Sequence, residues 1–129
     1  MTYEKILANN RQAFFNYFII DRFEVGLVLL GTEVKSLRLG LCNLKDSYAR
    51  AEQGEVWLYN CHIGPYPHGN RVNHEPMRPR KLLLHREEIE KLMGKTREKG
   101  LALIPLRFYL KKGRIKCELA LAQIGRAHV

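Results

Sequence analysis

The feature of this sequence that most constrains its fold is an alternation of apolar and charged residues close to the C-terminus. Residues 114–122 carry apolar side chains at every second position, at Ile115, Cys117, Leu119 and Leu121. A period of two indicates a strand with one buried face. Residues 101–110 are also strand-like and are joined to this segment by Lys112-Gly113, so the two predict an antiparallel hairpin. Pro105 cannot donate to a ladder and is expected at an edge or a bulge.

A second hairpin is predicted around Gln53-Gly54, which separates residues 46–52 from residues 55–63. Residues 17–30 are rich in β-branched and aromatic side chains and predict one long strand or a bent pair. Gly26, inside this segment, is expected to mark a bulge or a sharp bend.

Two helices are expected between these strands. The first runs from Thr32, a suitable N-cap, to Gly40, with Glu33 in the favourable first turn. The second spans residues 86–99 and is capped by Gly100. With about six strands, two or three short helices and no βαβ alternation, the pattern predicts a mainly β (α+β) fold, a small antiparallel barrel closed or capped by helices. A chain of 129 residues fits one such domain.

The positive charge is confined to the second half of the chain. Residues 1–63 carry 7 Lys or Arg against 7 Asp or Glu, whereas residues 64–129 carry 15 against 6. The whole excess of +9 therefore lies in one half, which favours a surface that binds a polyanion. A basic surface that serves only solubility is the alternative.

Cysteine usage and hydropathy favour a cytoplasmic protein. Cys42, Cys61 and Cys117 are odd in number and widely spaced, which indicates reduced, buried thiols rather than a disulfide framework. The apolar run at residues 14–20 is too short for a signal peptide or a membrane span and is followed at once by charged residues.

The segment of residues 64–79 is predicted to be a long, irregular loop, because it contains four prolines, two glycines and two asparagines. Such loops inside compact domains are usually functional. The loop and its exit combine cations with groups that stack or hydrogen-bond: Tyr66, His68, Asn70, Arg71, Asn73, His74, Arg78, Arg80 and Lys81. This combination favours contact with unpaired RNA, although a simple solvated loop is the alternative.

Patterns for catalysis and metal binding are weak. The carboxylates of Glu24, Glu33, Asp46 and Glu75 are not paired by local spacing, and no nucleophile elbow or P-loop is present. The histidines and cysteines lack the short paired spacings of zinc sites. We therefore expect no enzyme, no metal and no cofactor, and we expect His85 in the cap region of the second helix.

Three segments carry a resemblance to a known family. They are Gly31-Thr32-Glu33-Val34-Lys35-Ser36-Leu37-Arg38, Asn43-Leu44-Lys45-Asp46-Ser47-Tyr48 and Arg78-Pro79-Arg80-Lys81-Leu82-Leu83-Leu84-His85. With the motif Pro65-Tyr66-x-His68-Gly69-Asn70, they resemble the SsrA-binding (SmpB) proteins, from about Asn10 to Ala122. The resemblance implies an OB-like barrel and a non-enzymatic adaptor that binds the tRNA-like domain of tmRNA around its D-loop. It further implies contact with stalled ribosomes, and with elongation factor Tu indirectly through tmRNA.

By the same resemblance, Asn10, Glu24 and Leu83 match positions needed for tmRNA recognition. Leu83 is expected either to shape the RNA surface from below or to be an ordinary core leucine. The residues expected at the RNA-binding surface are Asn10, Tyr17, Glu24, Lys35, Arg38, His68, Asn70, Arg71, Asn73, His74, Arg78, Arg80, Lys81 and Leu83. Whether Lys35, Arg38, Lys111 and Lys116 face RNA, ribosome or water is left open by the sequence.

Two other functions are compatible with parts of the pattern. A general binder of single-stranded nucleic acid would use the same barrel with sequence-tolerant stacking. A basic nuclease would need clustered carboxylates or a metal. We expect a monomer with no membrane association.

The last seven residues depart from the family pattern. We expect residues 1–122 to form the RNA-binding domain and residues 123–129, Gln-Ile-Gly-Arg-Ala-His-Val, to be an artefact that replaces a native basic tail. These seven residues can be encoded by a DNA sequence that contains the start of a common sequencing adapter.

Overall fold

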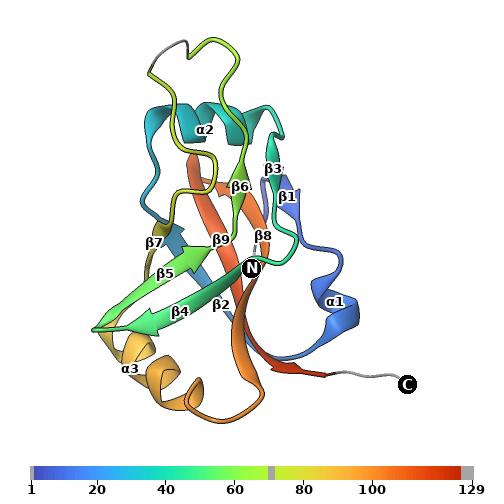
Figure 1. The fold of residues 1–129 in the computed structure, drawn as a ribbon, viewed down its shortest axis with the longest axis vertical. Coiled ribbons are helices and arrows are strands. Elements are labelled where there is room, and N and C mark those ends of the chain that lie inside the picture. The colour runs from blue at the N-terminus through green and yellow to red at the C-terminus, as the bar shows by residue number, and fades with distance from the viewer. Residues whose placement is uncertain (1, 70–71, 126–129) are drawn as a thin grey trace.

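The computed structural model describes residues 2–69 and 72–125 (Figure 1). These residues form nine strands and three helices. The strands are β1 (Lys5–Asn9), β2 (Tyr17–Leu27), β3 (Cys42–Asn43), β4 (Tyr48–Glu52), β5 (Glu55–Tyr59), β6 (His62–Ile63), β7 (Arg80–Leu83), β8 (Leu101–Lys111) and β9 (Arg114–Ile124). The helices are α1 (Ala13–Asn16), α2 (Gly31–Arg38) and α3 (Arg86–Lys95).

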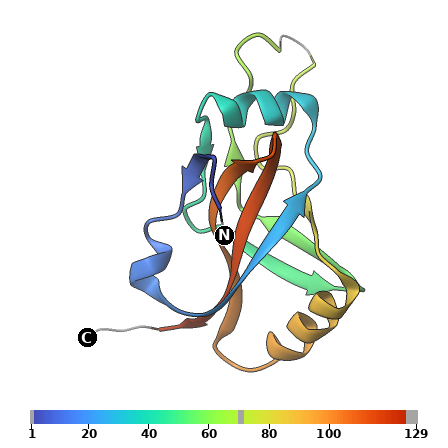
Figure 2. The same cartoon turned by 180° about the vertical axis from the view of Figure 1, so that it is seen from behind.

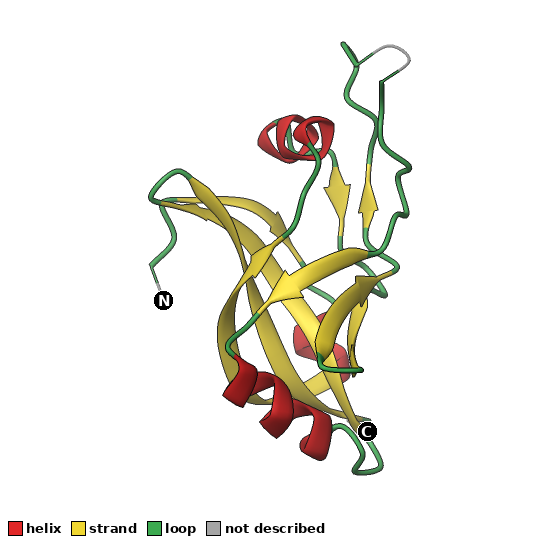
Figure 3. Cartoon of the chain, turned by 90° about the vertical axis from the view of Figure 1, so that its left-hand side faces the viewer, coloured by secondary structure: helices red, strands yellow, loops and turns green. Residues whose placement is uncertain are grey.

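Six strands close into a ring in the order β8-β4-β5-β7-β2-β9, because β9 pairs with β8 as well as with β2. Every pairing is antiparallel, so the predicted mainly β, antiparallel class is confirmed. Strand β1 adds to β8, and β3 with β6 forms a separate two-stranded sheet. Figure 3 shows α2 and the β3–β6 pair above the ring and α3 below it.

Both predicted hairpins are present, and local turn chemistry accounts for each. Lys112 and Gly113 both have positive φ, 51° and 75°, between the paired residues Lys111 and Arg114. Gln53 and Gly54 likewise have φ of 53° and 77°. Two successive positive φ values are those of the turn whose twist matches a two-residue hairpin. The register shift after Pro105 confirms the expected bulge in β8.

Gly26 has a different role from the one predicted. It lies in regular pairing between Lys116 of β9 and Leu83 of β7, and the bulge of β2 falls instead between Ile19 and Asp21. A Cβ at Gly26 would come 3.3 Å from the Cβ of Leu83. The glycine is therefore needed where β2 and β7 approach closely, and not to bend the strand.

Two apolar clusters pack on opposite faces of β9. Cys117, Leu119 and Leu121 face the interior of the ring, where they join the main core with buried side chains from the other strands. Ala120 and Ala122 face outward and pack with Ile104 and Leu106 of β8 beneath Ala13 of α1; this second set is the outer cluster. Figure 2 shows α1 beside the start of β2, at the end of that strand remote from α2.

The helix boundaries differ from the predictions by up to one turn. Thr32 was predicted as the N-cap of α2, but the helix begins at Gly31 with Leu30 as its N-cap. Helix α3 ends at Lys95 and not at Lys99, and there the Thr96 hydroxyl donates to a backbone carbonyl of the preceding turn (2.8 Å). His85 is the N-cap of α3, as expected. None of the three helices in the described part of the chain combines the length and apolar character needed to cross a bilayer.

The carboxylate of Glu33 joins α2 to the loop between β6 and β7. Its Oε1 accepts the backbone N–H of Leu30 (2.7 Å) and Nη2 of Arg78 (2.6 Å), and its Oε2 accepts Nε of Arg80 (2.7 Å). Burial alone would raise the pKa of Glu33, but the hydrogen bonds from Arg78, Leu30 and Arg80 outweigh it and hold the pKa below the ordinary value. Glu33 is therefore a buried, ionised group.

Arg80 carries the same network into the loop. Its side chain is fully buried, and besides Glu33 it donates to the carbonyls of Cys61 (2.5 Å) and Pro76 (3.1 Å). The side chain of Arg80 thus connects α2, the short link between β5 and β6, and the irregular loop. We call Glu33, Arg78 and Arg80 the Glu33 hub.

Replacing Glu33 by Gln should lower the free energy of unfolding at pH 7 by about 3–5 kcal/mol, because two guanidinium groups would lose their counter-ion, one of them in the interior. Chemical denaturation measures the difference. Glu55→Gln is the matched control, since Glu55 forms a solvent-accessible pair with Lys81 (2.7 Å) and should change stability much less. Equal effects of the two substitutions would contradict the assigned role.

The contribution of Glu33 should also depend on pH. Because the folded pKa is below the ordinary value of 4.5, the stabilisation is fully present above pH 4.5 and is lost as the pH falls through the folded pKa. The stability difference between wild type and Glu33→Gln should therefore shrink in acid. A difference that stays constant from pH 7 to pH 2 would show that Glu33 is not ionised in the folded protein.

Candidate nucleic-acid interface

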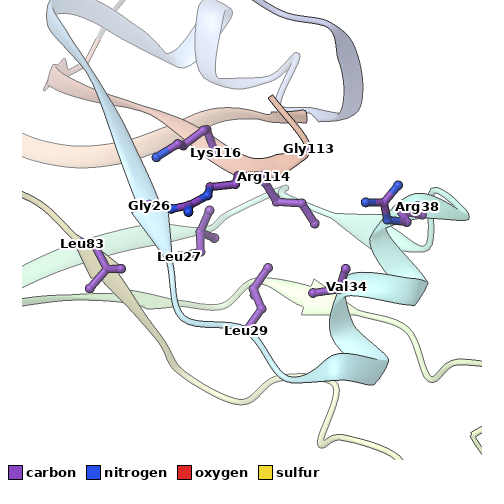
Figure 4. A pocket seen from close by; sticks show the side chains of 10 residues that line it. Gly26, Leu27, Leu29, Val34, Arg38, Leu83, Gly113, Arg114 and Lys116 are labelled. Carbon is purple, nitrogen blue, oxygen red and sulfur yellow. The ribbon is translucent and has the colours of Figure 1, made fainter. Parts of the chain in front are cut away.

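A pocket of about 320 Å³ opens where the β8–β9 turn approaches α2 (Figure 4). Its apolar lining comes from the end of β2, the following residues and α2, at Leu27, Leu29 and Val34. Its described lining residues also include three cations, Arg38, Arg114 and Lys116, and no carboxylate. An apolar surface bordered by positive charge suits a nucleotide, whose sugar and base are flanked by phosphate.

Glu24 lies on β2 two residues before Gly26 and borders a second hollow of about 360 Å³. This hollow shares Gly26, Leu83 and Lys116 with the pocket. The Tyr109 hydroxyl donates to Oε1 of Glu24 (2.6 Å), and Nζ of Lys111 lies 3.0 Å from Oε2. These two hydrogen bonds hold the pKa of Glu24 below its ordinary value. An oriented carboxylate among cations can accept a hydrogen bond from a 2′-hydroxyl or a base amine, which phosphate-binding groups cannot do.

Leu83 lies at the shared rim of the two hollows. Its side chain is half exposed, so the alternative of an ordinary core leucine is excluded. Its neighbour on β7, Leu82, is the residue that packs in the core. Its contact with RNA stays a prediction.

The cations at the exit of the loop are placed differently from the predicted surface. Arg80 is completely buried in the Glu33 hub and cannot contact RNA in this structure, which corrects that assignment. Arg78 keeps 28% of its side chain exposed, but both its Nε and Nη2 donate to Glu33. Lys81 is exposed and pairs with Glu55. Of these three cations, only Lys81 presents its charge to solvent without a buried partner.

Two residues that were predicted to bind RNA form hydrogen bonds that fix the conformation of the loop. Asn73 accepts the N–H of Tyr66 (3.0 Å) and donates to the carbonyl of the same residue (2.8 Å). His74 is buried, with Nδ1 2.8 Å from the Thr32 hydroxyl and Nε2 2.8 Å from the carbonyl of Ile63. Their polar atoms serve the loop conformation, so direct RNA contact by His74 is excluded in this structure.

The exposed groups of the loop gather above α2. Tyr66 meets His68 edge-on, with ring centroids 5.4 Å apart, and Nζ of Lys35 lies 5.4 Å from the centre of the Tyr66 ring. Lys35 and His68 are exposed. Asn70 and Arg71, which were also predicted to bind RNA, lie outside the described residues.

Asn10 and Tyr17 lie on either side of α1 in the chain, and neither lines the pocket. Asn10 is buried and its Nδ2 donates to the carbonyl of Pro105 (2.9 Å), where β8 is bulged. Tyr17 is half-buried against the outer cluster. Asn10 therefore stabilises the bulge, and any effect on RNA binding would act through that position.

A second charged network was missed by sequence reasoning. The buried carboxylate of Glu118 accepts Tyr3 (2.6 Å), Arg107 (2.6 Å) and Arg22 (3.1 Å) on the outer face of β9. The alternation around residue 118 predicted an outward charge. It could not indicate that partners from residues 3, 22 and 107 converge there, because pairing between distant strands brings them together.

Within residues 2–69 and 72–125, no three His, Cys, Asp or Glu side chains come close enough together to hold a metal ion. The three cysteines are free, and Cys61 and Cys117 are buried, as predicted. Burial raises the pKa of the Cys117 thiol well above its ordinary value.

Comparison with known protein families identifies the family of this chain. The family model described as "SmpB protein" matches residues 7–128. This chain belongs to the SmpB family. That residues 123–129 are foreign to the family stays a prediction; the family match extends to residue 128, and Gln123 and Ile124 continue β9 in the structure.

Named relatives and a solved structure agree with this membership. The SsrA-binding protein of Desulforudis audaxviator is 65% identical over 120 residues, which cover 93% of this chain and 78% of the relative. That of Carboxydothermus hydrogenoformans is 61% identical, with 93% and 80% covered. A solved chain described as "tmRNA-SmpB: a journey to the center of the bacterial ribosome" superposes with a TM-score of 0.77 at 45% identity, covering 94% of this chain and 85% of that one. The predicted OB-like class is thereby confirmed.

Replacing Asn10 by Ala should lower the free energy of unfolding by about 1–3 kcal/mol, because the buried carbonyl of Pro105 would lose its donor. Thermal or chemical denaturation of the isolated protein measures this. Asn43→Ala is the control, since Asn43 is exposed and accepts only a local N–H from Lys45. If Asn10→Ala is as stable as wild type, the bulge does not depend on this hydrogen bond.

Proposed function

We propose that this protein is a non-enzymatic adaptor of trans-translation. It binds the tRNA-like domain of tmRNA around the D-loop and helps to deliver tmRNA to stalled ribosomes. Membership of the SmpB family supports the proposal, together with relatives named SsrA-binding protein and a solved relative described with tmRNA and the bacterial ribosome. Its partners are then tmRNA and the ribosome, with elongation factor Tu engaged through tmRNA, in the cytoplasm.

The observation that carries the proposal is the pocket beside Glu24. Cations on α2 and β9 surround an apolar surface, and a fixed carboxylate on β2 lies next to it. Phosphates would be held by Arg38, Arg114 and Lys116, while Glu24 would read a hydroxyl or an amine. The protein needs no chemistry for this role, because recognition and positioning of the RNA are sufficient.

The same observation argues against a general binder of single-stranded nucleic acid. A sequence-tolerant site relies on stacking and positive charge, and a negative charge on its surface would repel the backbone. Glu24 lies beside the basic pocket and is anchored by Tyr109 and Lys111. A carboxylate in this position favours selection of one RNA over another.

Replacing Arg114 and Lys116 together by Ala should weaken binding of the tRNA-like domain and lower the slope of log K against log salt by about 2, one for each lost phosphate contact. Fluorescence anisotropy at several salt concentrations measures both quantities. Lys5→Ala/Lys45→Ala removes the same net charge from exposed positions on β1 and before β4, and should leave the slope unchanged. An equal loss in both double variants would remove the pocket from the proposed site.

Glu24→Gln should reduce the preference for the tRNA-like domain over ordinary tRNA, because the amide keeps the shape but lacks the charge that accepts hydrogen bonds strongly. A competition assay with both RNAs at two salt concentrations measures the ratio of affinities. Glu52→Gln, a carboxylate that accepts the Tyr59 hydroxyl on β5, is the control. Full discrimination by Glu24→Gln would exclude this residue from RNA selection.

A further inference from the structure

Helix α1 lies at the end of β2 remote from α2 (Figure 2), and it carries two exposed aromatic residues, Phe14 and Phe15. Phe14 is 43% exposed and Phe15 is 76% exposed, whereas Ala13 of the same helix is buried in the outer cluster. The helix thus packs through its smallest side chain and presents its largest to solvent. A ring as exposed as that of Phe15 contributes little to folding.

Arginine side chains are fixed beside these rings. The guanidinium carbons of Arg22 and Arg107 lie 5.9 and 5.7 Å from the centre of the Phe14 ring. Both guanidinium groups are held there by the buried carboxylate of Glu118. Phe14 and the two arginines therefore form one preorganised surface, and the exposed Phe15 is the next residue of α1.

This surface is positively charged. Two arginines share the single carboxylate of Glu118, which leaves a net charge of about +1, and the exposed side chain of Arg11 adds another. Asp21, next to Arg22 in the sequence, accepts the backbone N–H of Arg22 (2.8 Å), and its other carboxylate oxygen lies 3.8 Å from Nζ of Lys91. An aromatic surface with excess positive charge is complementary to nucleotides, which combine a flat ring with a negative phosphate. An acidic protein segment would match the charge but would not need flat rings.

We propose that Phe14 and Phe15, with Arg22 and Arg107, form a second RNA contact: a platform on which unpaired bases stack. This extends the proposed RNA-binding function to a surface separate from the pocket. The two surfaces share no residue: the platform is formed by α1, Arg22 of β2 and Arg107 of β8, whereas the pocket begins at Gly26 near the end of β2.

The test uses a 5′-fluorescein-labelled 12-nucleotide poly-U RNA and anisotropy at 50 and 200 mM salt. Phe14→Leu/Phe15→Leu keeps the apolar character of the surface but removes both flat rings. Its affinity should fall about fivefold or more, because stacking on an aromatic ring strengthens binding substantially for each base. Its salt dependence should not change, since the arginines remain. Phe15→Leu alone should show part of the effect, and its melting temperature should equal that of wild type.

Ile6→Ala, which truncates another exposed apolar side chain on β1, is the control and should bind the RNA like wild type. Crosslinking with 4-thiouridine RNA should label the tryptic peptide of residues 12–22, which contains both rings. Wild-type affinity of the double Leu variant, together with absence of that peptide from the crosslinks, would overturn the proposal. That result would instead identify an apolar surface for a protein partner.

The proposed function and the platform can fail separately. Loss of poly-U binding in the Leu variant, with no preference of wild type for the tRNA-like domain, would refute the adaptor role and support the platform. Selective binding of the tRNA-like domain that depends on Arg114 and Lys116, with no effect of the Leu variant on poly-U, would support the adaptor and refute the platform.

Discussion

The carboxylate of Glu33 is bonded in the protein interior to two guanidinium groups and a backbone N–H, and the position of the pocket depends on this arrangement. Helix α2 contributes Val34 and Arg38 to the pocket wall and buries Leu37 in the main core. Glu33 connects its first turn to Arg80, which begins β7 and also bonds the carbonyls of Cys61 and Pro76. A buried ion pair of this kind contributes little net stability compared with an apolar replacement, but it strongly disfavours any arrangement that leaves one charge alone. Its effect is to allow one placement of the helix.

The cations of this chain fall into two groups with different physical roles. Arg78, Arg80, Arg22 and Arg107 have carboxylate partners with almost no exposure, and most of their hydrogen bonds define the fold. Arg38, Arg114 and Lys116 face a hollow without an acid in its lining. The basic half of the sequence is therefore not a map of the RNA surface. Part of its charge is neutralised in the interior, and the pocket is formed where cations are left without buried partners.

The features that were predicted correctly, two tight turns and one bulge, depend on one or two neighbouring residues each. Lys112-Gly113 and Gln53-Gly54 specify their hairpins because the backbone conformation of a tight turn depends on those two residues. Pro105 identified its bulge because proline has no N–H. Arg80 was misassigned because the sequence around it, an arginine-rich loop exit, does not show whether its side chain is buried or exposed. Only the approach of Glu33, 47 residues earlier, decides between them.

The candidate site shows the same division. Glu24 and Leu83 line one hollow, and their contact with RNA stays a prediction that came from the family resemblance and not from any local pattern. No local pattern marks Arg114 as a binding residue, since charged residues alternate with apolar ones in any half-exposed strand. Asn10 was expected at the RNA surface from the family resemblance, yet its amide donor is used by the carbonyl of Pro105 on a distant strand. Long-range pairing thus determined which polar groups are available to a ligand.

The pairing of the first two strands of the chain with the last two also has a consequence for folding: β1 pairs with β8, and β2 pairs along most of its length with β9. Residues near the start of the chain thus contact residues about 100 positions later. During synthesis, β1 and β2 therefore have no partners in the ring until nearly the whole chain has been made, apart from the short pairing of β2 with β7. Contacts so distant in sequence slow folding, because a long loop must be closed before they contribute. The C-terminal hairpin is the step that closes the ring, and until it forms the apolar strand β2 is exposed to other chains and to chaperones.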